Sequence, residues 1–471
     1  MNELVAVIDI GSTYTKGALF SPAGDGLEVR GQGVCPTTRE DLGEGFFRVL
    51  GELARTAPGG AAVGDFPVRF SSSAKGGLRI AAVGLVPDLT LQVARLAAWS
   101  AGGKIVGDSS YRLTAERMKG LLEGDPDILL FVGGTEGGHE KYILANAEIV
   151  AASPFTGTVV YAGNSAVGPR VLEILRDKRT VPADNVMPQI GVVSTDSARG
   201  AIQRIFLDTI VHGRGLDRVR EFCGSDPKPT PLAVFDLVSL ISRSRADWDD
   251  FCVVDPGGAT TDFYSTGEAF RGAEGVLLKG IREPRVKRTV EGDLGLRVGA
   301  ESLLAEAEEF LREETENRPF SFEALKDHAA AMTAGPSKGP GGPRELEMDR
   351  LLCEAAAATA VLRHAGSLEA VFYPAGRVFI QQGKDLRPCR RLIGTGGFLS
   401  RHEMGDGLRR AFSRARSRVR GEKIPLIPED FRFYRDTLHL FPLLGSLVDD
   451  FPREAAACAL SHLTEETRTS E

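Results

Sequence analysis

Short apolar runs followed by glycine-containing polar turns recur along this chain. The run at 4–10 includes Asp9 near its end and leads through a Gly-Ser-Thr turn into a second run at 15–20, which predicts a β-hairpin. Residues 251–265, FCVVDPGGATTDFYS, repeat the order of strand, glycine turn and strand. The pattern therefore predicts two equivalent strand–turn–strand units that lie far apart in the sequence.

The residues between these two units follow a different pattern. Short buried runs at 104–108, 128–134 and 158–164 alternate with helical patterns near 111–123 and 139–147. Alternation of strands with helices is typical of an open, mostly parallel α/β sheet. Because 471 residues exceed the usual size of one compact core, we expect more than one domain.

Charge and cysteine content exclude some classes of protein. A formal net charge of −7 argues against sequence-independent nucleic-acid binding, which depends on Lys and Arg neutralising phosphates. The six cysteines show neither a CxxC pair nor the spacing of a disulfide framework, so we expect reduced thiols and a cytoplasmic protein. No run of about twenty apolar residues predicts a membrane helix.

The first turn carries groups that suit a magnesium-bound phosphate. Its successive backbone amides can form a concave anion site, to which two hydroxyls add donors and Lys16 adds a point charge. Asp9 would hold Mg²⁺ through water, because Mg²⁺ keeps several of its waters. A β-hairpin with a polar turn is the alternative. The candidate nucleotide-binding residues here are Gly11, Ser12, Thr13, Thr15 and Lys16.

The second turn repeats this chemistry with a carboxylate at its start. If the two turns face each other, they can hold the β- and γ-phosphates from both sides, with Mg²⁺ between Asp9 and Asp255. Pro256 departs from the pattern, because it removes one backbone donor from the turn. Two unrelated hairpins remain the alternative. The candidate nucleotide-binding residues here are Gly257, Gly258, Thr260 and Thr261, and Asp255 is a candidate magnesium ligand.

A third glycine turn follows an apolar run near the C-terminal end. Glycines at such a place allow a flat adenine and its ribose to lie against bare backbone at a helix start. An ordinary strand-to-helix connection is the alternative. The candidate adenosine-binding residues are Gly394, Thr395, Gly396 and Gly397.

The order of these three turns resembles the phosphate-1, phosphate-2 and adenosine motifs of the actin, Hsp70 and sugar-kinase superfamily. The resemblance implies an α/β protein of duplicated ribonuclease-H-like (actin/Hsp70-type) domains with ATP and Mg²⁺ in the cleft between them. It makes Asp9, Asp255 and Asp262 the candidate catalytic carboxylates. Within this plan we expect 1–100 to be the first half of domain I, 101–195 an inserted α/β subdomain, 196–248 its helical return and hinge, and 249–471 domain II with a helical subdomain.

A narrower resemblance rests on phrases spread over nearly the whole chain. VIDIGSTYTK, FVGGTEGGHEKYILANAE, VVDPGGATTDFYS, VEGDLGLRVGAESL, IGTGGFLS and DTLHLFPLLGSL look like the GlmL/MutL family. Members of that family are accessory proteins of adenosylcobalamin-dependent glutamate mutase and related aminomutases. The resemblance implies an ATP-dependent chaperone or reactivase whose partner is such a mutase. It leaves a homodimer, the identity of the mutase and the hydrolysis of ATP open.

Two other features have both a structural and a functional interpretation. The glycines at 133–138 follow a buried strand, so this loop either contacts a phosphate or the partner enzyme, or is a turn into the next helix. Asp293 is expected at a helix start, either as an acidic cap or as a residue that positions water. Two functions of other classes compete with the reactivase: a small-molecule kinase of the same superfamily and a filament or scaffold protein.

Overall fold

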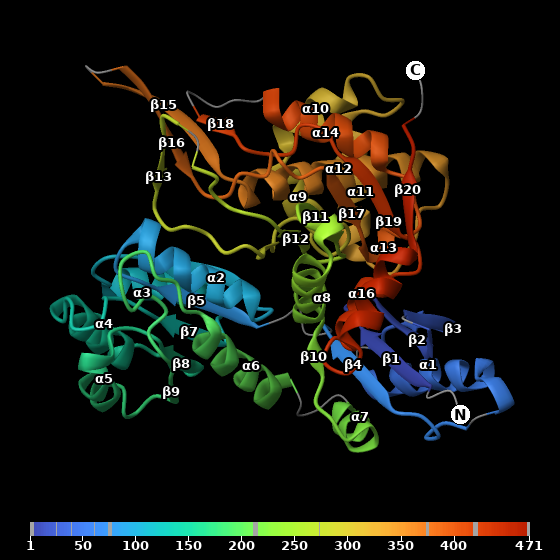
Figure 1. Cartoon of the computed structure of the whole chain (residues 1–471), viewed down its shortest axis with the longest axis horizontal. Helices are drawn as coiled ribbons and strands as arrows, with labels where there is room; N and C mark the ends of the chain where they lie inside the picture. Colours follow the sequence, from blue (N-terminus) through green and yellow to red (C-terminus); the bar gives the residue numbers. More distant parts are fainter. Residues whose placement is uncertain are drawn as a thin grey trace. The chain divides into compact units, whose positions relative to one another are not determined.

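The computed structural model describes residues 4–24, 26–38, 40–60, 62–73, 78–210, 215–272, 274–373, 376–417 and 423–468. The chain forms two compact units. Unit 1 comprises Met1–Gly76, His212–Leu277 and Pro284–Glu471, and unit 2 comprises Gly77–Val211 and Leu278–Glu283. Figure 1 labels most of the helices and strands of both units. Each unit is described separately below.

The first half of unit 1 is built on a five-stranded sheet in the order β3-β2-β1-β4-β10. The hairpin predicted at the start of the chain is present, since β1 pairs with β2 in antiparallel fashion. β3 continues antiparallel beside β2, whereas β4 and β10 run parallel to β1 and β4. The strands are β1 (Val5–Ile10), β2 (Tyr14–Ala23), β3 (Gly26–Pro36), β4 (Val68–Ser72) and β10 (Lys228–Pro229).

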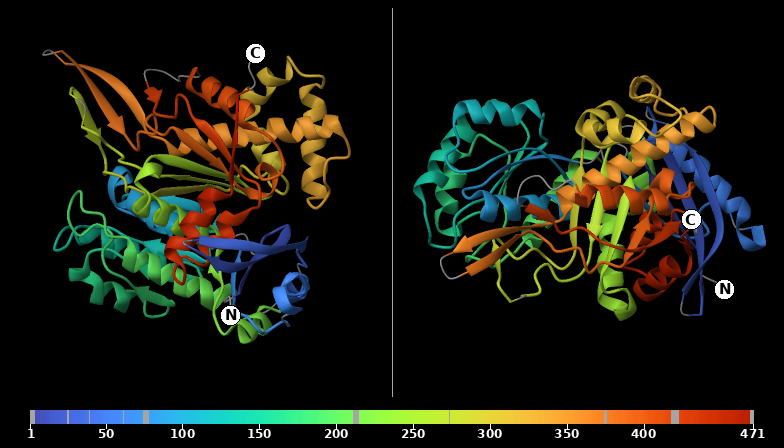
Figure 2. Two further views of the ribbon diagram at one scale, coloured as in Figure 1. Left: turned by 45° about the vertical axis from the view of Figure 1, so that its right-hand side comes forward. Right: turned by 90° about the horizontal axis from the view of Figure 1, so that it is seen from above.

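The second half of unit 1 repeats this topology. Its sheet has the order β14-β12-β11-β17-β19-β20, in which β12 and β14 are antiparallel neighbours of β11 and β12, and β17 and β19 run parallel to β11. Figure 2 shows this sheet in yellow-green, orange and red. The strands are β11 (Phe251–Pro256), β12 (Thr261–Ser265), β14 (Lys287–Glu291), β17 (Arg391–Gly394), β19 (Arg432–Asp436) and β20 (Leu463–Glu466). The expected duplicated ribonuclease-H-like fold is therefore confirmed.

The two sheets share one hydrophobic core. Val7 of β1 and Val253 of β11 are both fully buried in a cluster with the apolar side chains of α8 (Thr230–Ser244), α15 (Leu440–Gly445) and α16 (Pro452–Ser461). Full burial of such a side chain contributes about 1.5–3 kcal/mol. A Cβ on Gly445 would overlap the main chain of Ala233, so α15 and α8 cross closely only because this residue is glycine. The apolar side chains of β1 and β11 and of these three helices thus hold the two halves of unit 1 together.

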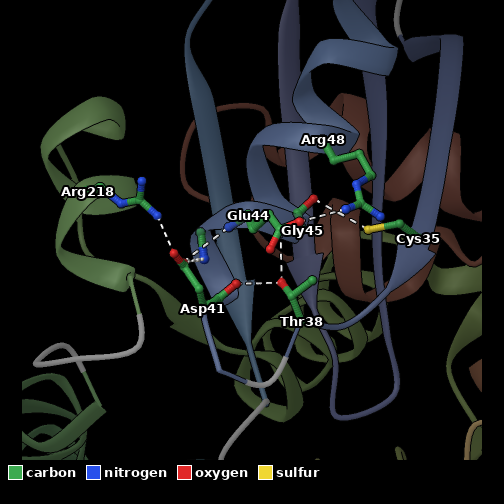
Figure 3. Close-up of polar contacts among 8 residues, drawn as sticks. Cys35, Thr38, Asp41, Glu44, Gly45, Arg48 and Arg218 are labelled. Atoms are coloured by element: carbon green, nitrogen blue, oxygen red, sulfur yellow. Dashed lines mark hydrogen bonds and ion pairs between the residues drawn. The ribbon is translucent and has the colours of Figure 1, made fainter.

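The opposite face of the first sheet is covered by α1 (Leu42–Thr56), whose start is capped by Asp41. Asp41 accepts hydrogen bonds from the backbone N–H groups of Gly43 and Glu44, at 3.0 and 3.3 Å, as an N-cap residue does. Figure 3 shows that the same carboxylate pairs with Arg218 of α7 (Leu216–Cys223). Cys35 of β3 donates to the Gly45 carbonyl beneath the helix. These contacts hold α1 in place against the sheet that carries the first turn.

Further helices and a small sheet complete the second half. α12 is rich in alanine and packs its small side chains into the core together with α11 and α14. A separate sheet has the order β13-β16-β15-β18. The elements are α9 (Ala300–Glu306), α10 (Glu308–Thr315), α11 (Phe322–Ala334), α12 (Pro343–His364), α13 (Gly396–Leu399), α14 (Gly405–Ser417), β13 (Val276–Lys279), β15 (Ser367–Tyr373), β16 (Gly376–Gln382) and β18 (Lys423–Pro425).

Unit 2 contains the inserted α/β fold, with an all-parallel sheet in the order β6-β5-β7-β8-β9. The insertion was expected to begin at 101, but β5 pairs with both β6 and β7, so its residues lie in unit 2, which starts at Gly77. The elements are β5 (Arg79–Val83), α2 (Gln92–Ser100), β6 (Lys104–Ser109), α3 (Ala115–Glu123), β7 (Ile128–Phe131), α4 (Lys141–Ala152), β8 (Thr158–Tyr161), α5 (Gly168–Ile174), β9 (Thr180–Pro182) and α6 (Asp196–Ile210).

Two expectations about the whole chain can be compared with the described residues. All six cysteines are present there as free thiols. Among the helices in those ranges, none combines the length and the apolar character that crossing a membrane requires.

Candidate functional site

The two predicted glycine turns of unit 1 have the same backbone geometry. Gly11 donates its N–H to the Tyr14 carbonyl at 3.1 Å, and Gly257 donates to the Thr260 carbonyl at 2.8 Å. A Cβ on Gly11 would lie 2.7 Å from the Tyr14 oxygen, and one on Gly257 would lie 3.0 Å from the Thr260 oxygen. The absence of a side chain therefore allows each turn to close.

The second turn approaches the first. A Cβ on Gly258 would lie only 3.1 Å from Oγ1 of Thr13. The Gly258 carbonyl accepts a hydrogen bond from the Arg297 N–H at 2.9 Å, which holds the turn in this position. The structure thus brings together two turns that are about half the chain apart in sequence.

Asp9 lies beside the first turn with one carboxylate oxygen already engaged. The side chain is 4% exposed, and Oδ1 accepts hydrogen bonds from Ser71 Oγ at 2.8 Å and from Thr230 Oγ1 at 2.6 Å. Burial raises the pKa of Asp9, while the two hydroxyls and the charge of Lys16 lower it. Oδ2 has no partner among the described residues and lies 3.9 Å from where a Gly11 Cβ would be. This oxygen is free to accept a bond from a magnesium-bound water, so the site fits the expected ion.

Asp255 occupies the equivalent position at the end of β11. Burial, the neighbouring charge of Asp262 and, more weakly, the charges of Asp9 and Asp436 raise the pKa of Asp255 to about 7, against the lowering effect of Lys16. Gly396 lies against this carboxylate, because a Cβ there would overlap Oδ1. Within the described ranges no three His, Cys, Asp or Glu side chains form a metal-binding group. A magnesium ion here would therefore need water among its ligands, as Mg²⁺ prefers.

Lys16 connects the three turns. Burial lowers the pKa of its ammonium, the charges of Asp9, Asp255 and Asp436 raise it, and Arg401 lowers it. A Cβ on Gly397, in the third turn, would lie 3.8 Å from Nζ of Lys16. The three turns therefore lie around one lysine.

The third turn is anchored by a residue that the sequence analysis did not select. Asp436, at the end of β19, accepts from Thr395 Oγ1 at 2.8 Å and from the N–H groups of Leu440 and Phe441 at 2.8 and 3.0 Å. Its carboxylate fixes the turn and the start of α15 together. Its position at the end of an apolar strand, like that of Asp9 and Asp255, was the available signal. Gly394 serves packing, since a Cβ there would lie 2.5 Å from the Phe433 ring.

Three selected residues have side chains that are engaged in other contacts. Thr15 is fully buried, with its hydroxyl 3.2 Å from Thr37 Oγ1. Thr261 donates to the Leu294 carbonyl at 2.5 Å. Asp262 forms a buried ion pair with Arg288, which opposes the increase in the pKa of Asp262 that burial causes. These contacts give all three side chains a structural role.

The second turn is supported by a buried polar cluster that sequence reasoning also missed. Arg297, whose N–H holds Gly258, donates from Nη2 to Asp349 Oδ2 at 2.8 Å. Asp349 is 1% exposed, and its other oxygen lies 2.8 Å from Nε2 of His328 in α11. The turn is thereby connected to α11 and α12. No local sequence signal identifies this cluster, because its members lie on three separate segments.

The two ambiguous features have structural contacts. Asp293 pairs with Arg363 at 2.8 Å, and α9 begins only at Ala300, so Asp293 is not at the expected helix start. In unit 2 the loop after β7 is held by hydrogen bonds from the Asn164 N–H to the Gly133 carbonyl at 3.0 Å and from Asn185 Nδ2 to the Gly134 carbonyl at 3.0 Å. Gly133 and Gly134 have φ values of 143° and 74°, which favour glycine.

Comparison with known proteins identifies the family. A family model described as "MutL protein" matches residues 5–463. The chain belongs to the MutL family. A curated relative, Protein MutL of Clostridium tetanomorphum, is 31% identical over 469 residues, which cover 97% of this chain and 98% of the relative. The resemblance of the sequence motifs to the GlmL/MutL family is thus confirmed.

Solved structures with a similar arrangement of helices and strands have low sequence identity to this MutL family member. A diol dehydratase-reactivating factor in nucleotide-free form is 11% identical, with a TM-score of 0.38, and the match covers 96% of this chain and 100% of that one. A glycerol dehydratase reactivase is also 11% identical, with a TM-score of 0.35 and coverage of 94% and 100%. At these scores the matches carry no argument about function.

Proposed function

We propose that this MutL family protein binds ATP with Mg²⁺ between the two glycine turns of unit 1 and uses the nucleotide to drive a conformational change. The observation that carries the proposal is the approach of Gly258 to Thr13, with Asp9, Asp255 and Lys16 beside it. Opposed turns with bare backbone amides suit the β- and γ-phosphates, which one turn alone could contact from one side only.

Each group has a distinct role in this proposal. The backbone of Gly11 to Thr13 and of Gly257 to Thr260 contacts phosphate oxygens, and Lys16 adds a positive charge. Oδ2 of Asp9 and the carboxylate of Asp255 hold the magnesium ion through water, and the ion when bound neutralises phosphate charge. Gly396 and Gly397 leave room for the adenosine. Because ATP binds to both halves of unit 1, it makes different contacts when the halves are open and when they are closed. This difference in affinity for the two states drives the conformational change.

We further propose that the protein acts as an accessory protein, a chaperone or reactivase, of an adenosylcobalamin-dependent mutase in the cytoplasm. Membership of the MutL family supports this role, and six free cysteines are consistent with a reducing compartment. The loop of unit 2 around Gly133 to Glu140 is the proposed contact with the mutase, because loops on a rigid scaffold carry most partner-specific contacts.

Isothermal titration with ATP and ADP, each with and without Mg²⁺, tests nucleotide binding. We expect the wild-type protein to bind Mg²⁺-ATP and the Asp9→Asn variant to bind it at least tenfold more weakly. Asn can still accept the hydrogen bonds of Ser71 and Thr230, so the fold should persist. Asp327→Asn, an exposed change on α11, is the matched control. Equal affinity of wild type and Asp9→Asn would contradict the proposed magnesium site.

A further inference from the structure

A pocket of about 320 Å³ lies beside Lys16 in unit 1. This volume is at the lower end of the range for small-molecule sites, about 300–1,000 Å³. Its walls come from both halves of the unit: β2, β3 and α1 of the first half, and α13 and the turn after β19 of the second. The polar residues of its wall include Lys16, Gln32, Glu52, Ser400, Arg401 and His439.

Two buried polar atoms on this wall have no hydrogen-bond partner. Ser400 is 8% exposed, and neither its Oγ nor Nδ1 of His439 bonds to any described residue. Leaving such a group buried and unsatisfied is unfavourable. His439 also has a φ of 54°, which is uncommon for a residue other than glycine. Two such unpaired atoms on one pocket wall indicate a ligand that forms hydrogen bonds with Ser400 Oγ and His439 Nδ1.

The pocket wall also contains two cations, Lys16 and Arg401. Neither side chain forms a salt bridge with a carboxylate of the described residues. The guanidinium of Arg401 lies 5.6 Å from the Tyr14 ring and is exposed. The charges of three nearby carboxylates act on the partly buried Lys16, whereas the Arg401 side chain is exposed. Arg401 is thus the cation most available to a ligand, and its planar fork suits an oxyanion.

The single carboxylate of the pocket wall limits where an anion can bind. Glu52 of α1 lies at the β3 side, where a Cβ on Gly33 would be 2.9 Å from its Oε2. Ser400 and Arg401 belong to the segment at the end of α13, and His439 to the turn before α15. An anion would therefore bind at the side of the second half, away from Glu52.

We propose that this pocket binds a phosphoryl oxyanion, held by the guanidinium of Arg401, the hydroxyl of Ser400, and an N–H at Nδ1 of His439. The source is either free phosphate or a phosphate group of the nucleotide, and only the second source rests on the proposed function. Because Lys16 and Gln32 of the first half line the same pocket, an occupied pocket connects the two halves of unit 1.

The test measures thermal unfolding of the full chain against inorganic phosphate concentration, without nucleotide or Mg²⁺. Phosphate stabilises many folded proteins weakly and without saturation, so the informative quantity is a saturable shift in Tm. We expect wild type to show one, and Arg401→Gln and Ser400→Ala to weaken it roughly tenfold or more, the effect of losing a hydrogen bond to a charged group. Arg344→Gln, an exposed change that removes the same charge outside the pocket, should leave it unchanged.

The outcomes separate the two proposals. A wild-type protein without a saturable response to phosphate, or one whose response survives both Arg401→Gln and Ser400→Ala, would overturn the pocket assignment whether or not ATP binds. Retention of the phosphate response in Asp9→Asn would support it as a property separate from the magnesium site. Adding ADP identifies the source: competition with phosphate points to a phosphate of the nucleotide, and additive stabilisation points to a free anion.

Discussion

Gly396 lies directly against Asp255, so close that a Cβ on the glycine would overlap Oδ1 of the carboxylate. The contact joins two motifs separated by about 140 residues, the second phosphate turn and the adenosine turn. Gly396 also has a φ of 88°, in the left-handed region. Two independent constraints therefore require glycine at this position.

Gly396→Val should abolish Mg²⁺-ATP binding. The new side chain must displace Asp255, and the backbone conformation costs a β-branched residue on the order of 1–3 kcal/mol. Titration calorimetry measures the affinity, and thermal unfolding of the nucleotide-free variant reports the strain. Gly51→Ala on α1, where no atom lies within 4 Å of the added Cβ, is the control. Wild-type affinity in Gly396→Val would mean that this turn is only structural.

Asp255→Asn should stabilise the protein in the absence of metal and nucleotide. Since burial raises the pKa of Asp255 to about 7, the folded state binds a proton that the unfolded state has lost above pH 4. Stability therefore falls as pH rises from about 4 to 7, and remains at its lower level above pH 7. An amide carries no charge, so the variant should have a higher Tm than wild type at pH 8.

The same comparison at lower pH provides the check on Asp255→Asn. The difference in Tm should shrink as pH falls through 7, because the wild-type carboxyl becomes protonated and neutral. Asp327→Asn, with an exposed carboxyl, should show no such dependence. A stabilisation of Asp255→Asn that is equal at pH 6 and pH 8 would show that burial of charge is not its cause.

Asp349→Ala should weaken nucleotide binding although it lies outside the turns. Asp349 is 1% exposed and holds Arg297, whose backbone N–H holds Gly258. Removing one partner of a buried ion pair costs about 3 kcal/mol, so a lower free energy of unfolding is also expected. Denaturant unfolding and titration with Mg²⁺-ATP measure the two effects.

A control on the same helix separates this effect from a general loss of charge. Glu347, also on α12, lies 3.5 Å from Arg318 and is more exposed, so Glu347→Ala should change stability by less than about 1 kcal/mol. If Asp349→Ala loses stability but keeps wild-type affinity for Mg²⁺-ATP, the cluster does not position the second turn.

ATP should change the affinity of this protein for its mutase, because a reactivase acts on its client only through a difference in binding between two states. A coupling of about 1–3 kcal/mol corresponds to roughly 5- to 150-fold in the dissociation constant. Pull-down of an adenosylcobalamin-dependent mutase with ATP, with ADP and without nucleotide measures it. Equal capture in all three states would contradict an ATP-driven switch, and no capture in any state would favour a small-molecule kinase.

The contact surface in unit 2 needs a variant that leaves its fold intact. Gly134 is unsuitable, because its φ is 74° and an added Cβ would lie 2.9 Å from Ile143. Tyr142, at the start of α4, is 43% exposed, so Tyr142→Ala should reduce mutase capture without unfolding unit 2. Unchanged capture by Tyr142→Ala, with wild-type nucleotide binding, would place the mutase elsewhere.

Sequence reasoning located the turns of unit 1, but it could not show which of their side chains are engaged in other contacts. The sequence showed that Thr15 and Thr261 lie in strands next to the turns. It did not show which face of each sheet would bind the nucleotide, because side chains on both faces are buried. Both hydroxyls therefore became candidates although they bond within the core. Asp262 was selected because of the superfamily resemblance, and only the fold shows that it forms an ion pair with Arg288.

The start of the insertion shows the same limit. β5 has the apolar pattern of any buried strand, so its sequence cannot say which sheet it joins. Its hydrogen-bonded partners are β6 and β7, and they place it in unit 2.

By itself, the sequence determined the strand–turn–strand units, their glycines, the carboxylates Asp9 and Asp255, and the family. Hydrophobic periodicity and the conformational preference of glycine act over a few residues, so they can be recognised from the sequence alone. The tertiary structure alone decided that Asp436 anchors the third turn, that Arg297 and Asp349 support the second, and that Ser400 and His439 share a pocket with Lys16. These contacts join segments that can be more than 400 residues apart. Long-range packing, which no local pattern encodes, determines which segments meet.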